Sequence, residues 1–422
     1  MHHRGDTDPS GGGAPAEDPS FSYRQVWWLG VGFLGIQLAF ATYNAFLPLL
    51  YRESIESRAA IGLLMGTDNL VGLLLIPVVG AWSDRVTSPL GRRLPFLVVG
   101  IPVAALTLFA IPFAAALLWT LIVTEVVFTA AMHLYRGPMA AMIVDHTPPR
   151  RRSTSSGIAQ LLGGTGTLVS FAGLSLLYDV DPRLTFGVAA AALLLSLAVV
   201  WRAADRFPAH VDNTTVAAVR PLRDALAGLR RLLDDDRRGE LLVLAAMLAG
   251  YVGFAGLQAM FPIYGVETLG LSEGRAAFLL STFALTYLVF ALFAGMLGTR
   301  FGEVRTMLVG LALLPALYLV AFVTRDATAV AGLLALVGLA WPLFAVPAVA
   351  LVANMGGRRG IGFHLGLYYV FTMTGQMVGP FVLGSTMDLL GNPGMWLAAA
   401  ATTLLGFVLL RSGRRRLGPL PT

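Results

Sequence analysis

Residues Gly80–Phe96 read GAWSDRVTSPLGRRLPF and lie between two long apolar runs. The runs cover residues 59–82 and 94–116, and each can cross a membrane, for which about 20 apolar residues suffice. A charged stretch between two such runs predicts a short loop that leaves the membrane and returns to it. Because a spanning backbone must satisfy its own hydrogen bonds, the flanking segments are predicted to be helices.

The composition of the whole chain extends this prediction. Of its 422 residues 56% are hydrophobic and only 13% are charged, whereas soluble proteins carry about 25% charged residues. There is no cysteine, which excludes disulfides and thiol chemistry. We predict an all-α integral membrane protein with twelve spans, at residues 26–50, 59–82, 94–116, 118–145, 155–178, 184–203, 240–264, 274–297, 305–324, 328–353, 361–387 and 393–411.

The positions of arginine predict the orientation. All 30 basic residues are arginine; with both termini inside the cell, five fall in outer loops, Arg136 lies within a span, and the other 24 lie in tails and inner loops. The positive-inside rule favours this arrangement. The excess of basic over acidic residues is therefore explained by membrane orientation, without a nucleic acid partner. We expect a bacterial inner membrane protein with cytoplasmic termini.

The two halves of the chain resemble each other. Pro138 is followed by Asp145 and then by arginines, and Pro347 is followed at the same spacing by Asn354 and then by arginines. A parallel repeat of six spans is typical of transporters that rock one half against the other. No GxxxxGK[ST] loop is present, so ATP is not expected to drive the protein. The expected organisation is a disordered tail 1–25, bundles 26–203 and 240–411, a cytoplasmic linker 204–239 and a tail 412–422.

The loop Gly80–Phe96 resembles the signature loop of the major facilitator superfamily, G-x-x-x-D-R-x-G-R-[RK]. Four extra residues separate Asp84-Arg85 from Gly91-Arg92-Arg93 here. This spaced form is similar to that of the glycoside–pentoside–hexuronide:cation symporters and the related sucrose:proton symporters. The stretches MGTDNLVGLLLIP, YRGPMAAMIVDHTPPRRRSTSSGI and GLYYVFTMTGQMVGPFVLGSTMDLLG support the resemblance. It implies the major facilitator fold and transport of a sugar with a cation.

The charges of this loop suit a gate on the cytoplasmic side. Asp84 can cap a helix or pair with arginine, and Arg92 can pair with Asp145. Such pairs hold one face closed and must break before it opens. We therefore assign Asp84, Arg85, Arg92, Arg93 and Asp145 to a cytoplasmic gate. The alternative is that these charges only fix the topology.

A polar stripe crosses the apolar span 118–145. Glu125, Thr129, His133 and Arg136 are spaced four, four and three residues apart, which places them on one helix face. Ionisable residues within a membrane are costly and indicate function. Fourth spans line the central cavity in the family that the chain resembles, so the resemblance places this stripe on the transport path.

Two acids are candidates for proton coupling. Asp68 in the second span and Glu125 in the fourth are expected at similar depth in the outer half of the membrane. Two carboxyl groups in a low-dielectric cavity cannot both ionise cheaply, so one is expected to hold a proton near neutral pH. We predict Glu125 as the first proton site and Asp68 as the second.

Amides, aromatic rings and one arginine are candidates for holding a sugar. Asn44 and Gln37 lie on one face of the first span and can bond to hydroxyl groups, as can Arg136. The predicted substrate-binding residues are Arg136, Asn44, Gln37, His133, Tyr43, Trp341, Gln258, Tyr368 and Gln376. The alternatives are helix packing for His133, a tie between helices for Arg136, and interhelical hydrogen bonds for the amides.

These features predict a secondary transporter that carries a sugar or glycoside, expected to be a disaccharide, together with a proton. The first alternative is a proton antiporter that exports an apolar compound, and the second is a sensor that no longer transports. No Ser/His/Asp or metal-binding constellation is found, so neither catalysis, a cofactor nor a metal is expected. The expected partners are the substrate, the proton and the lipid bilayer, and the chain is expected to work as a monomer.

Overall fold

The computed structural model describes residues 21–208, 238–355 and 357–416. In these ranges the chain is helical and contains no strand. The helices are α1 (Tyr23–Arg52), α2 (Arg58–Arg85), α3 (Leu94–Ala114), α4 (Leu118–Asp145), η1 (Pro149–Arg151), α5 (Arg152–Val169), η2 (Ser170–Leu174), α6 (Ser175–Tyr178), α7 (Pro182–Ala203), α9 (Arg238–Glu267), α10 (Glu273–Phe301), α11 (Glu303–Val323), α12 (Ala327–Met355), α13 (Gly357–Leu390) and α14 (Gly394–Arg416).

Eleven helical stretches in these ranges are long and apolar enough to cross a membrane. The 34-residue helix α13 is the twelfth, which confirms the predicted all-α fold. The fifth predicted span differs in detail, because the π-helical turn η2 divides it into α5 and α6. The predicted tail 1–25, linker 204–239 and tail 412–422 fall largely outside the described residues.

Several helices extend beyond the predicted spans, and α1 and α14 are examples. Helix α1 begins at Tyr23 rather than residue 26, and α14 continues to Arg416 rather than ending at residue 411. Hydropathy marks only the apolar part of a helix, and the helix can continue in polar residues beyond it. The last turn of α14 carries Arg414, Arg415 and Arg416, whose positive charges are favourable at a helix C-terminus.

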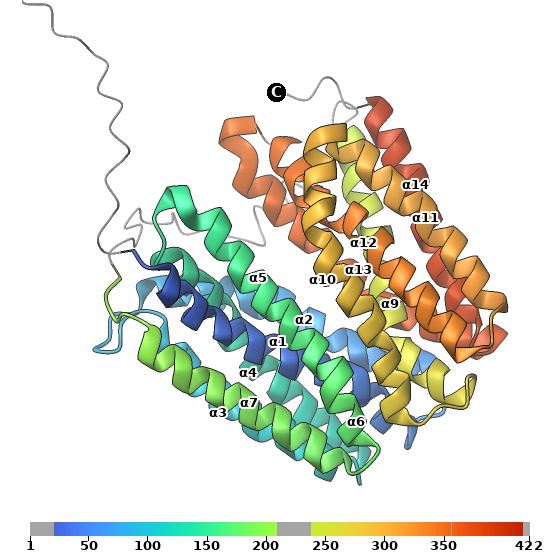
Figure 1. Cartoon of the computed structure of the whole chain (residues 1–422), viewed down its shortest axis with the longest axis horizontal. Coiled ribbons are helices and arrows are strands. Elements are labelled where there is room, and N and C mark those ends of the chain that lie inside the picture. The colour runs from blue at the N-terminus through green and yellow to red at the C-terminus, as the bar shows by residue number, and fades with distance from the viewer. Residues whose placement is uncertain (1–20, 209–237, 356, 417–422) are drawn as a thin grey trace, which may run out of the picture.

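The helices form two groups. Helices α1–α7 pack mainly among themselves and form the N-terminal bundle, and α9–α14 form the C-terminal bundle. In Figure 1 the bundles meet near α6, α9 and α10 and diverge toward the other end. We call the side that carries the loop 86–93 the basic face, and the side that carries the loops 53–57, 179–181 and 268–272 the opposite face.

The bundles approach most closely where α2 crosses α13 near the opposite face. A Cβ atom at Gly62 or Gly66 of α2 would collide with the carbonyl oxygen of Pro380 or Met377 of α13. Small residues allow this approach, and close packing drives association of helices in lipid. The contact closes the opposite face between the bundles.

Candidate functional site

Glu125 of α4 is fully buried and bonded to hydroxyl groups. Tyr43 of α1 donates to its Oε1 at 2.8 Å, and Tyr51, two turns later on α1, donates to its Oε2. The Thr67 hydroxyl of α2 lies 3.4 Å from Oε1. Because burial of an unpaired carboxylate is costly, these donors make an ionised Glu125 tolerable. The site can hold this carboxyl group in either protonation state.

Asp68 and His133 form a second buried pair. Nε2 of His133 lies 3.0 Å from Oδ1 and 3.1 Å from the carbonyl oxygen of Asp68. Both oxygens are acceptors when Asp68 is ionised, so Nε2 then carries a hydrogen. The ring fits because Gly72, one turn after Asp68, has no side chain; a Cβ there would lie 2.7 Å from the ring. His133 was predicted to bind substrate; in this structure its ring pairs with Asp68.

A cavity between the bundles is lined by side chains from both. Its volume is about 30 Å³, and four carboxamide residues reach it: Asn44, Asn69, Gln258 and Gln376. Asn44 and Asn69 come from the N-terminal bundle, and the two glutamines come from α9 and α13. Three of the four were predicted, and the structure brings them together. In this state the cavity has room for water but not for a sugar.

Arg136 lies beside this cavity. Its guanidinium stands over the Phe40 ring, 5.3 Å from the centroid, and Phe40 lines the cavity. The side chain is half-buried, and a cation on an aromatic face is stabilised by the ring quadrupole. Gln37 lies one turn before Phe40 on α1 and packs against Gly163 of α5.

The predicted aromatic ligands are less accessible than expected. Trp341 is 2% exposed and stacks on Phe254, with ring centroids 4.0 Å apart. Tyr368 is also buried, and its hydroxyl lies 3.2 Å from that of Tyr251. Tyr43 is fully buried and its hydroxyl is used by Glu125. Each of these three side chains therefore has a partner inside the protein in this state.

The opposite face holds a cluster of charges that joins the bundles. Glu267, the last residue of α9, accepts from Arg52 of α1 and Arg58 of α2, each at 2.6 Å. Asn392 also donates to Glu267 at 2.8 Å. Each of the two arginine side chains is between 20% and 30% exposed, so water weakens these pairs only in part.

Two aspartates each cap a helix of the other bundle. Asp388 of α13 accepts from the hydroxyl of Ser57 and from the backbone of Arg58 and Ala59, at the N-terminus of α2. Asp179, just after α6, accepts from Ser272 and from the backbone of Gly274, at the N-terminus of α10. In the repeat α2 corresponds to α10, so the two caps are related by internal symmetry.

Removal of these caps is expected to open the opposite face. Asp388→Ala or Asp179→Ala removes a cap of about 1 kcal/mol, which lowers the closed-to-open ratio by about fivefold. The double variant should lower it by about 25-fold, since the sites are separate. The measurement is a spin-label distance distribution between cysteines placed at the exposed residues Ala116 and Thr328, because the chain has no native cysteine.

The control for the caps is Asp181→Ala. Asp181 caps α7 through the backbone N–H of Arg183 and lies in the same bundle as its partner. Its loss should therefore leave the distance between the bundles unchanged. A double variant with wild-type distances would show that the two caps do not hold the face closed.

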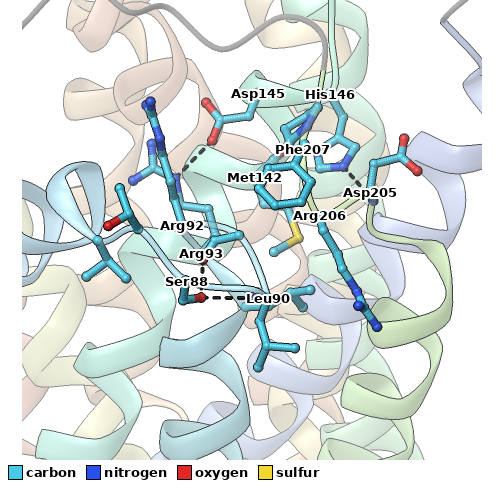
Figure 2. A pocket seen from close by; sticks show the side chains of 15 residues that line it. Ser88, Leu90, Arg92, Arg93, Met142, Asp145, His146, Asp205, Arg206 and Phe207 are labelled. Carbon is cyan, nitrogen blue, oxygen red and sulfur yellow. Dashed lines mark hydrogen bonds and ion pairs between the residues drawn. The ribbon is translucent and has the colours of Figure 1, made fainter.

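Charges on the basic face tie the N-terminal bundle together. Arg93 pairs with Asp145 at 2.9 Å (Figure 2). It also pairs with Asp84 at 2.6 Å and donates to Ser83. Burial disfavours the charge of Arg93, but Asp145 and Asp84 outweigh burial and raise its pKa above the ordinary value. Asp145 was expected to pair with Arg92, and the structure pairs it with the next residue. These pairs lie within one bundle in this state.

Replacement of Arg93 is expected to destabilise the protein. Arg93→Gln leaves Asp145, which is 7% exposed, without its cation, and loss of one partner of a buried pair costs about 3 kcal/mol. Thermal unfolding in detergent should show a lowered midpoint. Arg206→Gln is the control, because Arg206 is exposed on the same face. Equal midpoints for the two variants would contradict the assigned role of Arg93.

A second cavity among the described residues lies at this face. Its volume is about 330 Å³, and its walls come from residues 86–94, from the end of α4 and from residues 205–208 (Figure 2). His146 joins two of these walls, since its Nε2 accepts from the backbone N–H of Asp205 at 3.0 Å. All the walls belong to the N-terminal bundle side of the molecule. The cavity is therefore separate from the site between the bundles.

Sequence reasoning missed several residues of the site. Tyr51, Thr67 and Asn69 carry no charge and are common in membrane helices. The one usable signal was that Thr67 and Asn69 flank Asp68 in the stretch MGTDNL. Glu267 and Asp388 were not predicted as functional residues. They lie just beyond the ends of predicted spans, where charged residues are common.

Comparisons with known proteins identify relatives. A family model described as Major Facilitator Superfamily matches residues 29–278 and 243–421. The chain is 35% identical over 82 residues to human proton-associated sugar transporter A, which covers 19% of this chain and 11% of that protein. It is 24% identical over 388 residues to the class E tetracycline resistance protein of Escherichia coli, which covers 86% of this chain and 89% of that protein.

The same architecture is found among solved structures. A crystal structure of a bacterial homologue of the human lysosomal transporter Spinster, in an inward-facing and occupied conformation, matches with a TM-score of 0.71. The identity is 16%, and the match covers 94% of this chain and 97% of that chain. This likeness concerns the fold. The match to the human sugar transporter is local, since the chain spans about a tenth of its length.

Proposed function

Since the chain belongs to the Major Facilitator Superfamily, it is a membrane transporter rather than an enzyme, and we propose that it carries a sugar or glycoside together with a proton. The observation that carries the proposal is the position of Glu125. Its carboxyl group is buried among hydroxyl donors from α1 and α2. Asn44 and Asn69 of the same two helices line the cavity between the bundles. A proton and a polar solute therefore have adjoining sites.

The proposed orientation follows from arginine. By the positive-inside rule the basic face is the proposed cytoplasmic face. We propose the inner membrane of a bacterium as the location. The opposite face, closed by Glu267, Asp179 and Asp388, is then the outer face. The structure is thus the state in which the substrate site is shut off from the outside. Transport requires the outer contacts to break while those on the inner side form.

The chemistry of the cavity favours a neutral polyhydroxylated substrate. Carboxamides both donate and accept hydrogen bonds, as sugar hydroxyls do. Arg136 is close to Phe40 on the cavity wall and adds a fixed donor. The local likeness to a proton-associated sugar transporter points in the same direction. We propose a disaccharide-sized substrate, bound when the bundles separate at one face.

A second candidate is a proton antiporter that exports an apolar compound. The match to a tetracycline resistance protein extends over most of the chain. The aromatic group of Tyr251, Phe254, Trp341 and Phe344 in the C-terminal bundle also suits an apolar ring. In this candidate Glu125 would bind the proton that is exchanged for the compound.

The test uses purified protein in lightly buffered proteoliposomes with an internal pH dye. Sucrose, maltose, trehalose and melibiose are added in turn. Internal acidification with one sugar supports symport. If no sugar gives a response and an apolar compound instead dissipates an imposed proton gradient, the protein is the exporter.

A further inference from the structure

The last turn of α1 contacts two charged sites at once. Tyr51 donates its hydroxyl to Glu125 within the N-terminal bundle. Arg52, the next residue and the last of α1, donates to Glu267 of the C-terminal bundle at 2.6 Å. Successive residues of one helical turn therefore connect the buried acid to the contact between the bundles.

Tyr51 is held firmly in this position. It is fully buried, although it stands one residue before the end of α1. Arg52 also donates to the carbonyl oxygen of Ile55, just beyond the helix. Because Tyr51 fixes this turn from the inside, the backbone of Arg52 is already ordered when its guanidinium pairs with Glu267. If the hold on Tyr51 weakens, Arg52 must be ordered without this support.

The protonation state of Glu125 changes the strength of its hydrogen bond with Tyr51. An ionised carboxylate accepts from both tyrosines and makes charge-assisted hydrogen bonds, which are about twice as strong as neutral ones. A protonated carboxyl group keeps one O–H as a donor and bonds more weakly to Tyr51. The hydrogen bonds from Tyr51 and Tyr43 therefore stabilise the ionised form of the acid while the opposite face is closed.

We propose that Tyr51 is the positioning residue through which the charge of Glu125 controls closure of the opposite face. The inference rests on the proposed function in taking Glu125 as the proton site. Proton loss tightens the Tyr51 contact and fixes Arg52 on Glu267, and proton uptake loosens both. By linkage, the acid binds its proton more tightly when this face is open. A symporter needs this order, because it takes up protons outside and releases them inside.

Other titratable groups near Glu125 are few. Helix α1 contributes Tyr43 and Tyr51. Helix α2 contributes Asp68, which is paired with His133 of α4. Arg136 lies three turns further along α4 itself, and α3 has no ionisable side chain between Leu94 and Ala114. Helix α5 carries Arg152 only at its start, on the basic face. Asp68 is thus the group that must be tested beside Glu125.

The test measures closure without transport. Spin labels at Ala116→Cys and Thr328→Cys report the distance across the opposite face between pH 8 and pH 5. We expect the closed-to-open ratio to fall by about tenfold on acidification, as the difference between a charged and a neutral hydrogen bond of about 1.4 kcal/mol implies. Tyr51→Phe should reduce this change to less than about twofold.

Tyr43→Phe is the matched control. It also removes one hydroxyl donor from Glu125, but Tyr43 lies two turns before Arg52. We expect its pH response to keep the full amplitude with a displaced midpoint. Arg52→Gln should open the face at every pH. A merely structural role of Tyr51 predicts instead that both Phe variants lose amplitude equally.

The outcomes separate the two proposals. A wild-type response that Glu125→Gln abolishes and Tyr51→Phe leaves intact would overturn the role of Tyr51 and keep Glu125 as the proton site. A response that survives Glu125→Gln and disappears in Asp68→Asn would overturn both assignments. Distances that do not depend on pH in the wild type would also overturn the inference, and the sugar test above would then decide whether transport is proton-coupled at all.

Discussion

Glu125→Gln is expected to abolish accumulation of substrate against its gradient while exchange of labelled substrate continues. A pH difference of one unit supplies 1.36 kcal/mol per proton, which allows a one-proton symporter about tenfold accumulation. Glutamine keeps a carbonyl oxygen that can accept from Tyr43 or Tyr51, so the site should still pack. It cannot gain or release a proton, so the accumulation ratio should fall to about one. The measurement is uptake into proteoliposomes with and without the pH difference.

The matched control is Glu303→Gln. Glu303 is the first residue of α11 and lies outside the buried site, so its loss should leave accumulation at about tenfold. If Glu125→Gln still accumulates substrate and Asp68→Asn does not, coupling resides in the Asp68–His133 pair. Loss of exchange as well as accumulation in Glu125→Gln would show that the residue is needed for binding or folding rather than for coupling.

Gly66→Val is expected to hold the opposite face open and to stop transport. A Cβ at Gly66 would collide with the carbonyl oxygen of Met377, and a backbone oxygen cannot turn away as a side chain can. Overpacking of this kind costs about 1–3 kcal/mol, which corresponds to a roughly 5- to 150-fold lower closed-to-open ratio. The helices α2 and α13 can avoid the collision by separating. Both exchange and accumulation should therefore fall.

Opening is measured by labelling a single cysteine at Ala259. Ala259 is 5% exposed and lines the cavity between the bundles, so a membrane-impermeant maleimide reaches it from outside intact cells only when this face opens. Gly66→Val should raise the labelling rate. Gly332→Ala is the control, since no atom lies within 4 Å of a Cβ there. Unchanged labelling together with normal transport in Gly66→Val would refute the packing argument.

The candidate site shows how far residue patterns can lead. The stripe of Glu125, His133 and Arg136 was predicted because charge inside an apolar run has few explanations. Asn44, Gln258 and Gln376 were predicted as polar candidates, and they meet at the cavity. The partners of these residues could not be predicted. Tyr51 and Asp388 act across helices that are distant in the sequence, and a hydrophobic pattern carries no information on which helix faces which.

The sequence by itself determined the twelve-helix architecture, the loop Gly80–Phe96 that carries the family resemblance, and the buried position of Glu125. These follow from the hydrophobic effect and from backbone hydrogen bonding, which act locally along the chain. Only the tertiary structure decided that hydroxyl groups surround Glu125, that His133 serves Asp68, that Trp341 is covered and that Arg93 holds Asp145. Each of these depends on how helices rotate and approach one another, and in lipid that is set by side-chain packing rather than by hydropathy.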